Sequence, residues 1–299
     1  MSGNGGTERL GLLLALVGAL GFSLKAIFIK LAYPYGVDAI TLLALRMGFS
    51  LPVFLWAGLL RRHGGAPLGA GDGWRLFLLG VLGYYGASIL DFWGLQYISA
   101  GLERLILFTY PTLTLLIGVL FQGRPFTRRE LLAVVLCYAG IGFAFAHDLA
   151  FADTRSVLIG GGLVFASSVA YALYLSGSGA MIQRLGSLRF SALAMLMSTG
   201  VTLLHFAVAQ PLSALVQPLP VYGWALAMAV FATVIPVFAL GGAIHRLGAG
   251  RAALYGMVGP ILTIGFGWWL LAEPVSAAQL AGAALVVAGV FVVGRGRNK

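Results

Sequence analysis

Ten long apolar segments follow one another along the chain, separated by short stretches that carry most of the charged residues. They cover residues 10–29, 38–60, 74–98, 102–121, 128–147, 156–176, 188–209, 221–245, 250–271 and 276–294. Each is close to the roughly 20 residues that a helix needs to cross a bilayer. Because helices satisfy their own backbone groups in lipid, the pattern predicts an all-α polytopic membrane protein with ten transmembrane helices.

Residues typical of helix starts stand at several of these segments. Asp38 and Asp72 come just before the second and third segments, as candidate N-caps. Thr127–Glu130 and Ser276–Gln279 have the spacing of capping boxes at the starts of the fifth and tenth segments.

Composition supports a membrane protein. Of the 299 residues, 60% are hydrophobic and only 9% charged, against about 25% charged in soluble domains. The net charge of +10 is spread in ones, twos and threes between the apolar segments, which indicates contact with lipid headgroups and not with nucleic acid. With a single cysteine and four scattered histidines, we expect no disulfide, metal or cofactor.

The charged loops predict the topology. Positive loops stay in the cytoplasm, and alternate loops hold most of the basic residues: Arg9, Arg61, Arg62, Arg75, Arg124, Arg128, Arg129, Arg184, Arg189, Arg246, Arg251, Arg295, Arg297 and Lys299. The opposite loops hold Lys30, Arg104 and Arg155. We therefore expect a multi-pass protein of the inner (plasma) membrane with both termini cytoplasmic. The alternative for the first segment is a signal peptide cleaved near Ala19–Gly21.

The chain repeats itself after 149 residues. This offset pairs Ala100–Gly101 with Ala249–Gly250, Pro111 with Pro260, Pro125 with Pro274, and Ala139–Gly140 with Ala288–Gly289. Each half, 1–149 and 150–299, holds five predicted helices. Because five is odd, the second half crosses the membrane in the opposite sense, as in the inverted repeats of many secondary transporters.

These paired motifs resemble the drug/metabolite transporter superfamily, and within it the EamA type. The pattern of Ala-Gly, Pro, Gly and Pro occurs twice, ending in Glu273–Pro274 in the second half. The first half departs from the family by having Arg124–Pro125 in place of Glu-Pro. The aromatic-rich interior is most similar to the YddG-type aromatic amino-acid exporters. The resemblance implies ten spans in two repeats and the export of small molecules.

Two prolines and several stripes of polar residues suggest where a substrate binds. Pro111 and Pro260 lie at corresponding depths of the two halves, where each interrupts helical hydrogen bonding; they either form the site or only bend the helices. Helical spacing puts polar and aromatic residues on single faces of four helices: Gly18, Phe22 and Lys25; Tyr84, Ser88 and Asp91; Ser167, Tyr171, Tyr174 and Ser178; and Ser191, Met195, Ser198, Thr202 and His205. The alternative is hydrogen bonding between helices.

Asp91 is the acidic residue furthest inside a predicted span, and Lys25 and Arg46 are its candidate partners. Together they could bind a zwitterion, or they could form a permanent structural pair. We interpret Glu103 as a helix cap and Glu273 as interfacial. The expected substrate contacts are Lys25, Tyr84, Ser88, Asp91, Tyr110, Pro111, Ser167, Tyr171, Tyr174, His205, Tyr255 and Pro260.

Taken together, the sequence predicts a secondary transporter, and not an enzyme, that exports aromatic or other apolar amino acids by alternating access through a central cavity. It is expected to work as a monomer in the bilayer. Export of drugs or other metabolites is the main alternative. An intramembrane enzyme is less well supported, because no convergent catalytic set is present.

Overall fold

The computed structural model describes residues 4–60, 67–123, 125–151, 153–247, 252 and 255–296, and helices are the regular elements of these ranges. They are α1 (Asn4–Ala32), η1 (Tyr33–Tyr35), α2 (Ala39–Leu55), η2 (Trp56–Leu60), α3 (Asp72–Gly80), η3 (Val81–Gly86), α4 (Ala87–Gly94), α5 (Ala100–Leu107), α6 (Tyr110–Gln122), α7 (Arg128–Phe151), α8 (Thr154–Leu185), α9 (Ser187–Ala209), η4 (Leu212–Leu215), α10 (Leu219–Ala229), η5 (Val230–Val234), α11 (Ile235–Leu247), α13 (Gly259–Leu271) and α14 (Ala277–Gly296).

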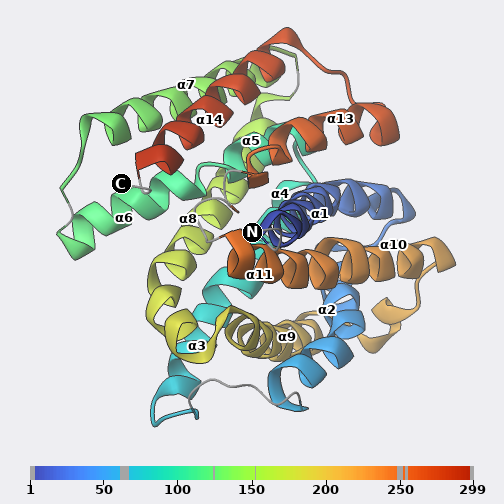
Figure 1. Ribbon diagram of the computed structural model, residues 1–299. Coiled ribbons are helices and arrows are strands. Elements are labelled where there is room, and N and C mark those ends of the chain that lie inside the picture. Colours follow the sequence, from blue (N-terminus) through green and yellow to red (C-terminus); the bar gives the residue numbers. More distant parts are fainter. Residues whose placement is uncertain are drawn as a thin grey trace.

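Eight helical stretches of the described chain are long and apolar enough to cross a membrane, and they match the first eight predicted segments in order. The last two predicted segments correspond to shorter apolar helices, Gly259–Leu271 and Ala277–Val292. The all-helical fold of the described residues is therefore confirmed, with eight helices able to span a membrane, and the count of ten spans stays a prediction. In Figure 1, α1 lies between α13 on one side and the consecutive helices α10 and α11 on the other. It contacts all three helices.

Most predicted helix starts are confirmed. The Asp38 carboxylate accepts the N–H groups of Ile40 and Thr41 at 2.9 and 3.0 Å. Both capping boxes close as expected, with Thr127 and Glu130, and likewise Ser276 and Gln279, exchanging hydrogen bonds.

The N-cap predicted at Asp72 is wrong. The N-cap is Gly71, which adopts a left-handed conformation with φ 85°, and Asp72 is the first helical residue. The Asp72 carboxylate instead accepts the Gly69 N–H and pairs with Arg184 at the end of α8. The Asp72 carboxylate therefore forms an ion pair with a residue distant in sequence, Arg184, and does not cap its own helix.

The two predicted proline breaks are present. The fourth span is divided at Phe108–Thr109, and Pro111 lies in the first turn of α6. The ninth is divided at Met257–Val258, and Pro260 lies in the first turn of α13. Proline fits the first turn because its missing N–H has no helical partner there.

Hydrophobic patterning gave no sign of the π-helical turns inside three spans. η3 begins at Val81 and η5 at Val230, which is the 149-residue offset of the repeat. The third, η2, has no counterpart, since residues 205–209 are α-helical in α9. π-turns are frequent at functional sites, and η3 and η5 both border the interior charges described below.

Contacts between helices follow the same offset. Gly11 packs against Leu247, with 2.8 Å from a built Cβ to Leu247 Cγ, and Gly160 packs against Ile98, with 2.8 Å to its Cγ2. Adding 149 to Gly11 gives Gly160, and adding it to Ile98 gives Leu247. Exchanging the two halves therefore turns one contact into the other.

The helices α7 and α14, side by side in Figure 1, form the contact between the last spans of the two halves. A Cβ built on Gly140 would lie 2.5 Å from the carbonyl oxygen of Gly282, and one on Gly289 would lie 2.7 Å from that of Ala133. Exchange of the halves interconverts these two contacts as well. The Cys137 thiol donates to the carbonyl oxygen of Val286 at 3.7 Å, and these residues are 149 apart. An approximate twofold axis therefore passes close to this pair.

Candidate functional site

The interior of the bundle holds one lysine between two carboxylates. Lys25 Nζ of α1 lies 2.7 Å from Asp91 Oδ2 of α4 and 3.9 Å from Glu103 Oε1 of α5. The side chains of Asp91 and Glu103 are 1% and 0% exposed. Of the two partners predicted for Asp91, the structure thus places Lys25 in contact with it.

Arg46 has other partners in the same region. Its Nε donates to Thr233 Oγ1 of η5 at 2.9 Å, and its Nη1 to Ser88 Oγ at 3.5 Å. Its guanidinium also lies 5.7 Å from the ring centroid of Phe92. Arg46 is therefore a cation held beside the ion pair by neutral groups.

The interpretation of Glu103 as a helix cap is wrong. Ser99 is the N-cap of α5, accepting the Leu102 N–H at 3.1 Å, whereas Glu103 points at Lys25. The sequence could have shown this. The repeat partner of Glu103 is Ala252, which has no capping side chain, so the second half has no glutamate at the equivalent position.

Arg104, the next residue, connects the two proline breaks. Its guanidinium stacks over the Phe108 ring at 5.1 Å. It also lies beside Gly259 at the second break, where a built Cβ would be 2.9 Å from Arg104 Nη2. The absence of a side chain at Gly259 therefore leaves room for this cation.

Four of the predicted tyrosines lie together. The Tyr174 hydroxyl donates to that of Tyr84 at 3.1 Å, and the two rings meet edge to face at 5.2 Å. Tyr171 stacks on Tyr174 at 5.6 Å and meets Tyr110 edge to face at 5.1 Å. Phe190 also stacks on Tyr174, at 6.0 Å. We call Tyr84, Tyr110, Tyr171 and Tyr174 the tyrosine cluster.

The predicted face of the third span links the two groups. Tyr84 contacts the tyrosine cluster, Ser88 contacts Arg46, and Asp91 contacts Lys25. One face over two turns therefore carries an aromatic, a hydroxyl and a carboxylate in sequence, as the spacing predicted.

Three predicted residues, Ser167, Tyr255 and His205, have other partners. The Ser167 hydroxyl donates to the Ala87 carbonyl oxygen at 2.6 Å, which is the helix-to-helix role given as the alternative. Tyr255 packs with Leu247 and Ala252 in a different hydrophobic cluster. His205 Nδ1 is 3.0 Å from the Tyr85 hydroxyl, and its ring faces Trp93.

Glu273 does more than the predicted interfacial role. Both of its carboxylate oxygens accept the Ala100 N–H, at 3.0 and 3.1 Å, and Oε1 lies 3.9 Å from Lys30 Nζ. A residue of the second half therefore caps the start of α5 in the first half, since the free N–H groups of a helix start favour a carboxylate.

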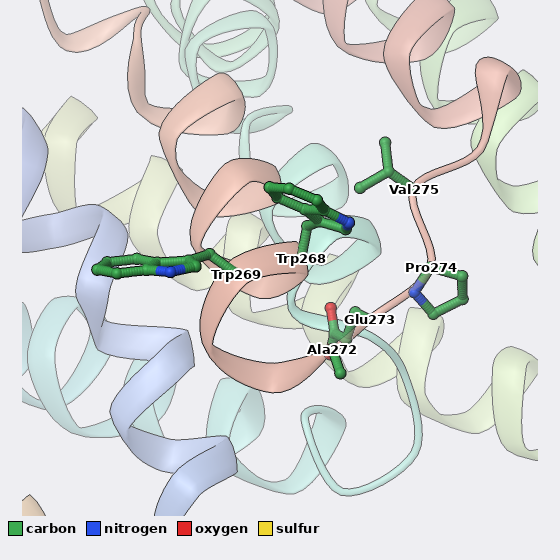
Figure 2. A pocket seen from close by; sticks show the side chains of 6 residues that line it. All are labelled: Trp268, Trp269, Ala272, Glu273, Pro274 and Val275. Atoms are coloured by element: carbon green, nitrogen blue, oxygen red, sulfur yellow. The ribbon is translucent and has the colours of Figure 1, made fainter.

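Two cavities lie apart from the tyrosine cluster and the Lys25 ion pair. One, of about 420 Å³, lies at the end of α13 and is lined by Trp268, Trp269, Ala272, Glu273, Pro274 and Val275. Figure 2 shows Trp268 on the side of Val275, with Trp269 projecting the other way. The second, of about 350 Å³, is an apolar groove between α2 and α9, lined mainly by leucines. Neither is lined by a predicted contact residue.

Comparison with known proteins identifies the family. The sequence model of the EamA-like transporter family matches residues 9–146 and again 158–295. The chain belongs to the EamA-like transporter family. The two matches are themselves displaced by 149 residues at both ends, which agrees with the repeat, whereas the exact boundary between the halves stays a prediction.

Relatives of this transporter-family chain carry the same general description. A Bacillus subtilis (strain 168) protein named "Uncharacterized transporter YcbK" is 32% identical over 95% of this chain and 91% of its own. "Uncharacterized transporter YyaM", from the same organism, is 24% identical over 72% and 70%. A solved crystal structure superposes with a TM-score of 0.67 at 18% identity, over 98% of this chain and 100% of the other. These comparisons favour a transporter over an enzyme.

Proposed function

We propose that this EamA-like protein is a secondary transporter that exports small zwitterionic metabolites, with aromatic or other apolar amino acids as the preferred class. The observation that carries the proposal is the single helix face of Tyr84, Ser88 and Asp91, which joins the tyrosine cluster to the interior charges. An aromatic amino acid needs these two kinds of contact side by side.

The pair of Lys25 and Asp91 suits a zwitterionic substrate, because each charge of the substrate can replace one member of the pair. An unpaired charge in the membrane interior is costly, so Lys25 and Asp91 separate only if each finds another partner. The ammonium of an amino acid can take the place of Lys25 on Asp91, and its carboxylate can take the place of Asp91 on Lys25. A zwitterion therefore opens the pair without leaving either charge alone.

The tyrosine cluster supplies a surface for the side chain of the substrate. Its rings meet both edge to face and stacked, at centroid distances of 5.1 to 5.6 Å. A further ring in such a geometry gains about 0.5–1.5 kcal/mol beyond its buried area. The first helix break lies next to this surface, because the Phe108 ring at the break meets the ring of Tyr110 at 5.8 Å.

The test is flux of labelled tryptophan, lysine and glutamate into liposomes that contain the purified protein. We expect saturable tryptophan flux, its loss in Tyr171→Ala, and unchanged flux in Tyr35→Ala, a control tyrosine that is 46% exposed. Flux of a lipophilic cation with none of tryptophan would contradict the amino-acid proposal and favour drug export.

The transport cycle we propose is alternating access, in which the two halves rock about the axis near Cys137. We further propose that the protein works as a monomer in the plasma membrane with both termini in the cytoplasm. The topology is tested by fusing a reporter that is active only in the cytoplasm to the amino terminus or to the carboxyl terminus. Both fusions should be active.

A further inference from the structure

Asp91 and Glu103 are two carboxylates with one close cation. Because oxygens of both lie within 3.9 Å of Lys25 Nζ, the two groups are neighbours across α4 and α5. Apart from the ion-pair contact of Asp91 Oδ2 with Lys25, none of their four oxygens has a hydrogen-bond donor among the described residues. Buried carboxylates normally have hydrogen-bond donors, so the ionised pair is short of them.

The charged and titratable groups around the pair come from four neighbouring elements, and most have partners of their own. They are Lys25 and Lys30 of α1, Tyr33 of η1, Arg46 of α2 and Arg104 of α5. Lys30 reaches towards Glu273, and the Tyr33 hydroxyl donates to the Phe92 carbonyl oxygen. Lys25 is thus the cation in direct contact with both carboxylates.

The shared contact with Lys25 then indicates a bound proton. Two neighbouring carboxylates withdrawn from water repel each other strongly, because that repulsion is weakly screened. With one proton shared between them, the three groups in contact, Asp91, Glu103 and Lys25, carry no net charge, while Arg46 and Arg104 contact neutral and aromatic groups. The shared proton also supplies the missing donor, an O–H from one carboxyl to an oxygen of the other.

We propose that Asp91 and Glu103 form a single proton-binding site, which holds one proton while Lys25 contacts both carboxylates. The two residues share this proton, and the site does not rest on the proposed function.

Infrared spectroscopy of the full chain in lipid nanodiscs tests the site without any substrate. At pH 7 we expect the carbonyl stretch of a protonated carboxyl group, shifted in heavy water. It should disappear in Asp91→Asn and in Glu103→Gln, because each leaves one carboxylate paired with Lys25. Lys25→Met should strengthen the band, because both carboxyl groups then take a proton.

Glu130→Gln is the control, since Glu130 is an exposed residue of a capping box in which glutamine also serves. A wild-type spectrum without the band at pH 7 overturns the proposal even if the variants do not fold. A band that survives in both Asp91→Asn and Glu103→Gln overturns it as well.

Discussion

Glu273 connects the two halves through one backbone hydrogen bond, and replacing it with alanine measures the value of that connection. Both oxygens of Glu273 accept the Ala100 N–H at 3.0 and 3.1 Å, and Ala100 is 0% exposed. In Glu273→Ala this N–H is left buried without an acceptor. Such a loss costs about 1–3 kcal/mol.

The ion pair with Lys30 contributes less. Its atoms are 3.9 Å apart, and its side chains are 24% and 18% exposed, so we expect at most about 1 kcal/mol from it. Glu273→Gln keeps an oxygen for the Ala100 N–H and loses only the charge. Glutamine should therefore cost less than alanine, by about 1 kcal/mol or more.

The assay is the apparent free energy of unfolding in mixed micelles of a mild detergent and dodecyl sulfate, for Glu273→Ala, Glu273→Gln and Lys30→Met. Glu273→Ala should be the most destabilising of the three variants. Equal losses of unfolding free energy in Glu273→Ala and Glu273→Gln would refute the hydrogen-bond argument and make the charge the cause. A loss in Lys30→Met as large as that in Glu273→Ala would assign the effect to the ion pair.

Three further outcomes are expected. Gly140→Leu should reduce the yield of folded protein because its Cβ would meet a carbonyl oxygen at 2.5 Å, whereas Gly142→Leu, with nothing within 4 Å, should be tolerated; size-exclusion profiles decide. Tyr174→Phe should destabilise by only about 0.6 kcal/mol by unfolding in mixed micelles, since it removes one hydroxyl contact in the membrane; a loss of several kcal/mol would contradict this. At Asp153, hydrogen bonds from Ser156 lower the pKa of the carboxyl below its ordinary 3.8. The cap is therefore fully effective above pH 4 and lost as the pH falls through the folded-state pKa, and amide exchange at the start of α8 should show this loss in the wild type and not in Asp153→Asn.

Local features were predicted well from the sequence. Apolar length located the spans, and both capping boxes formed because each needs only residues three positions apart. The repeat offset was visible in paired prolines, which the structure places at equivalent helix breaks.

Features that depend on partners distant in the chain were predicted less well. Asp72 and Glu103 both stand at helix starts, where an acidic residue is common, and local spacing does not reveal that Arg184 or Lys25 faces them. Ser167 shares a helix face with the tyrosine cluster, but its hydroxyl is satisfied by the carbonyl of Ala87. The π-turns could not be predicted from the sequence, because they change the backbone without changing the apolar pattern.

The self-paired contact between Cys137 and Val286 has a practical consequence for experiments. Suppose that the inward-open and outward-open conformations are related by exchanging the roles of the two halves. The exchange turns the contact between Cys137 and Val286 into itself, so this contact is the same in both conformations. The interface between α7 and α14 is then a fixed pivot. Cys137, which is 0% exposed there, stays hidden from thiol reagents throughout the cycle. Spectroscopic labels can therefore be attached to introduced cysteines while the native cysteine remains in place.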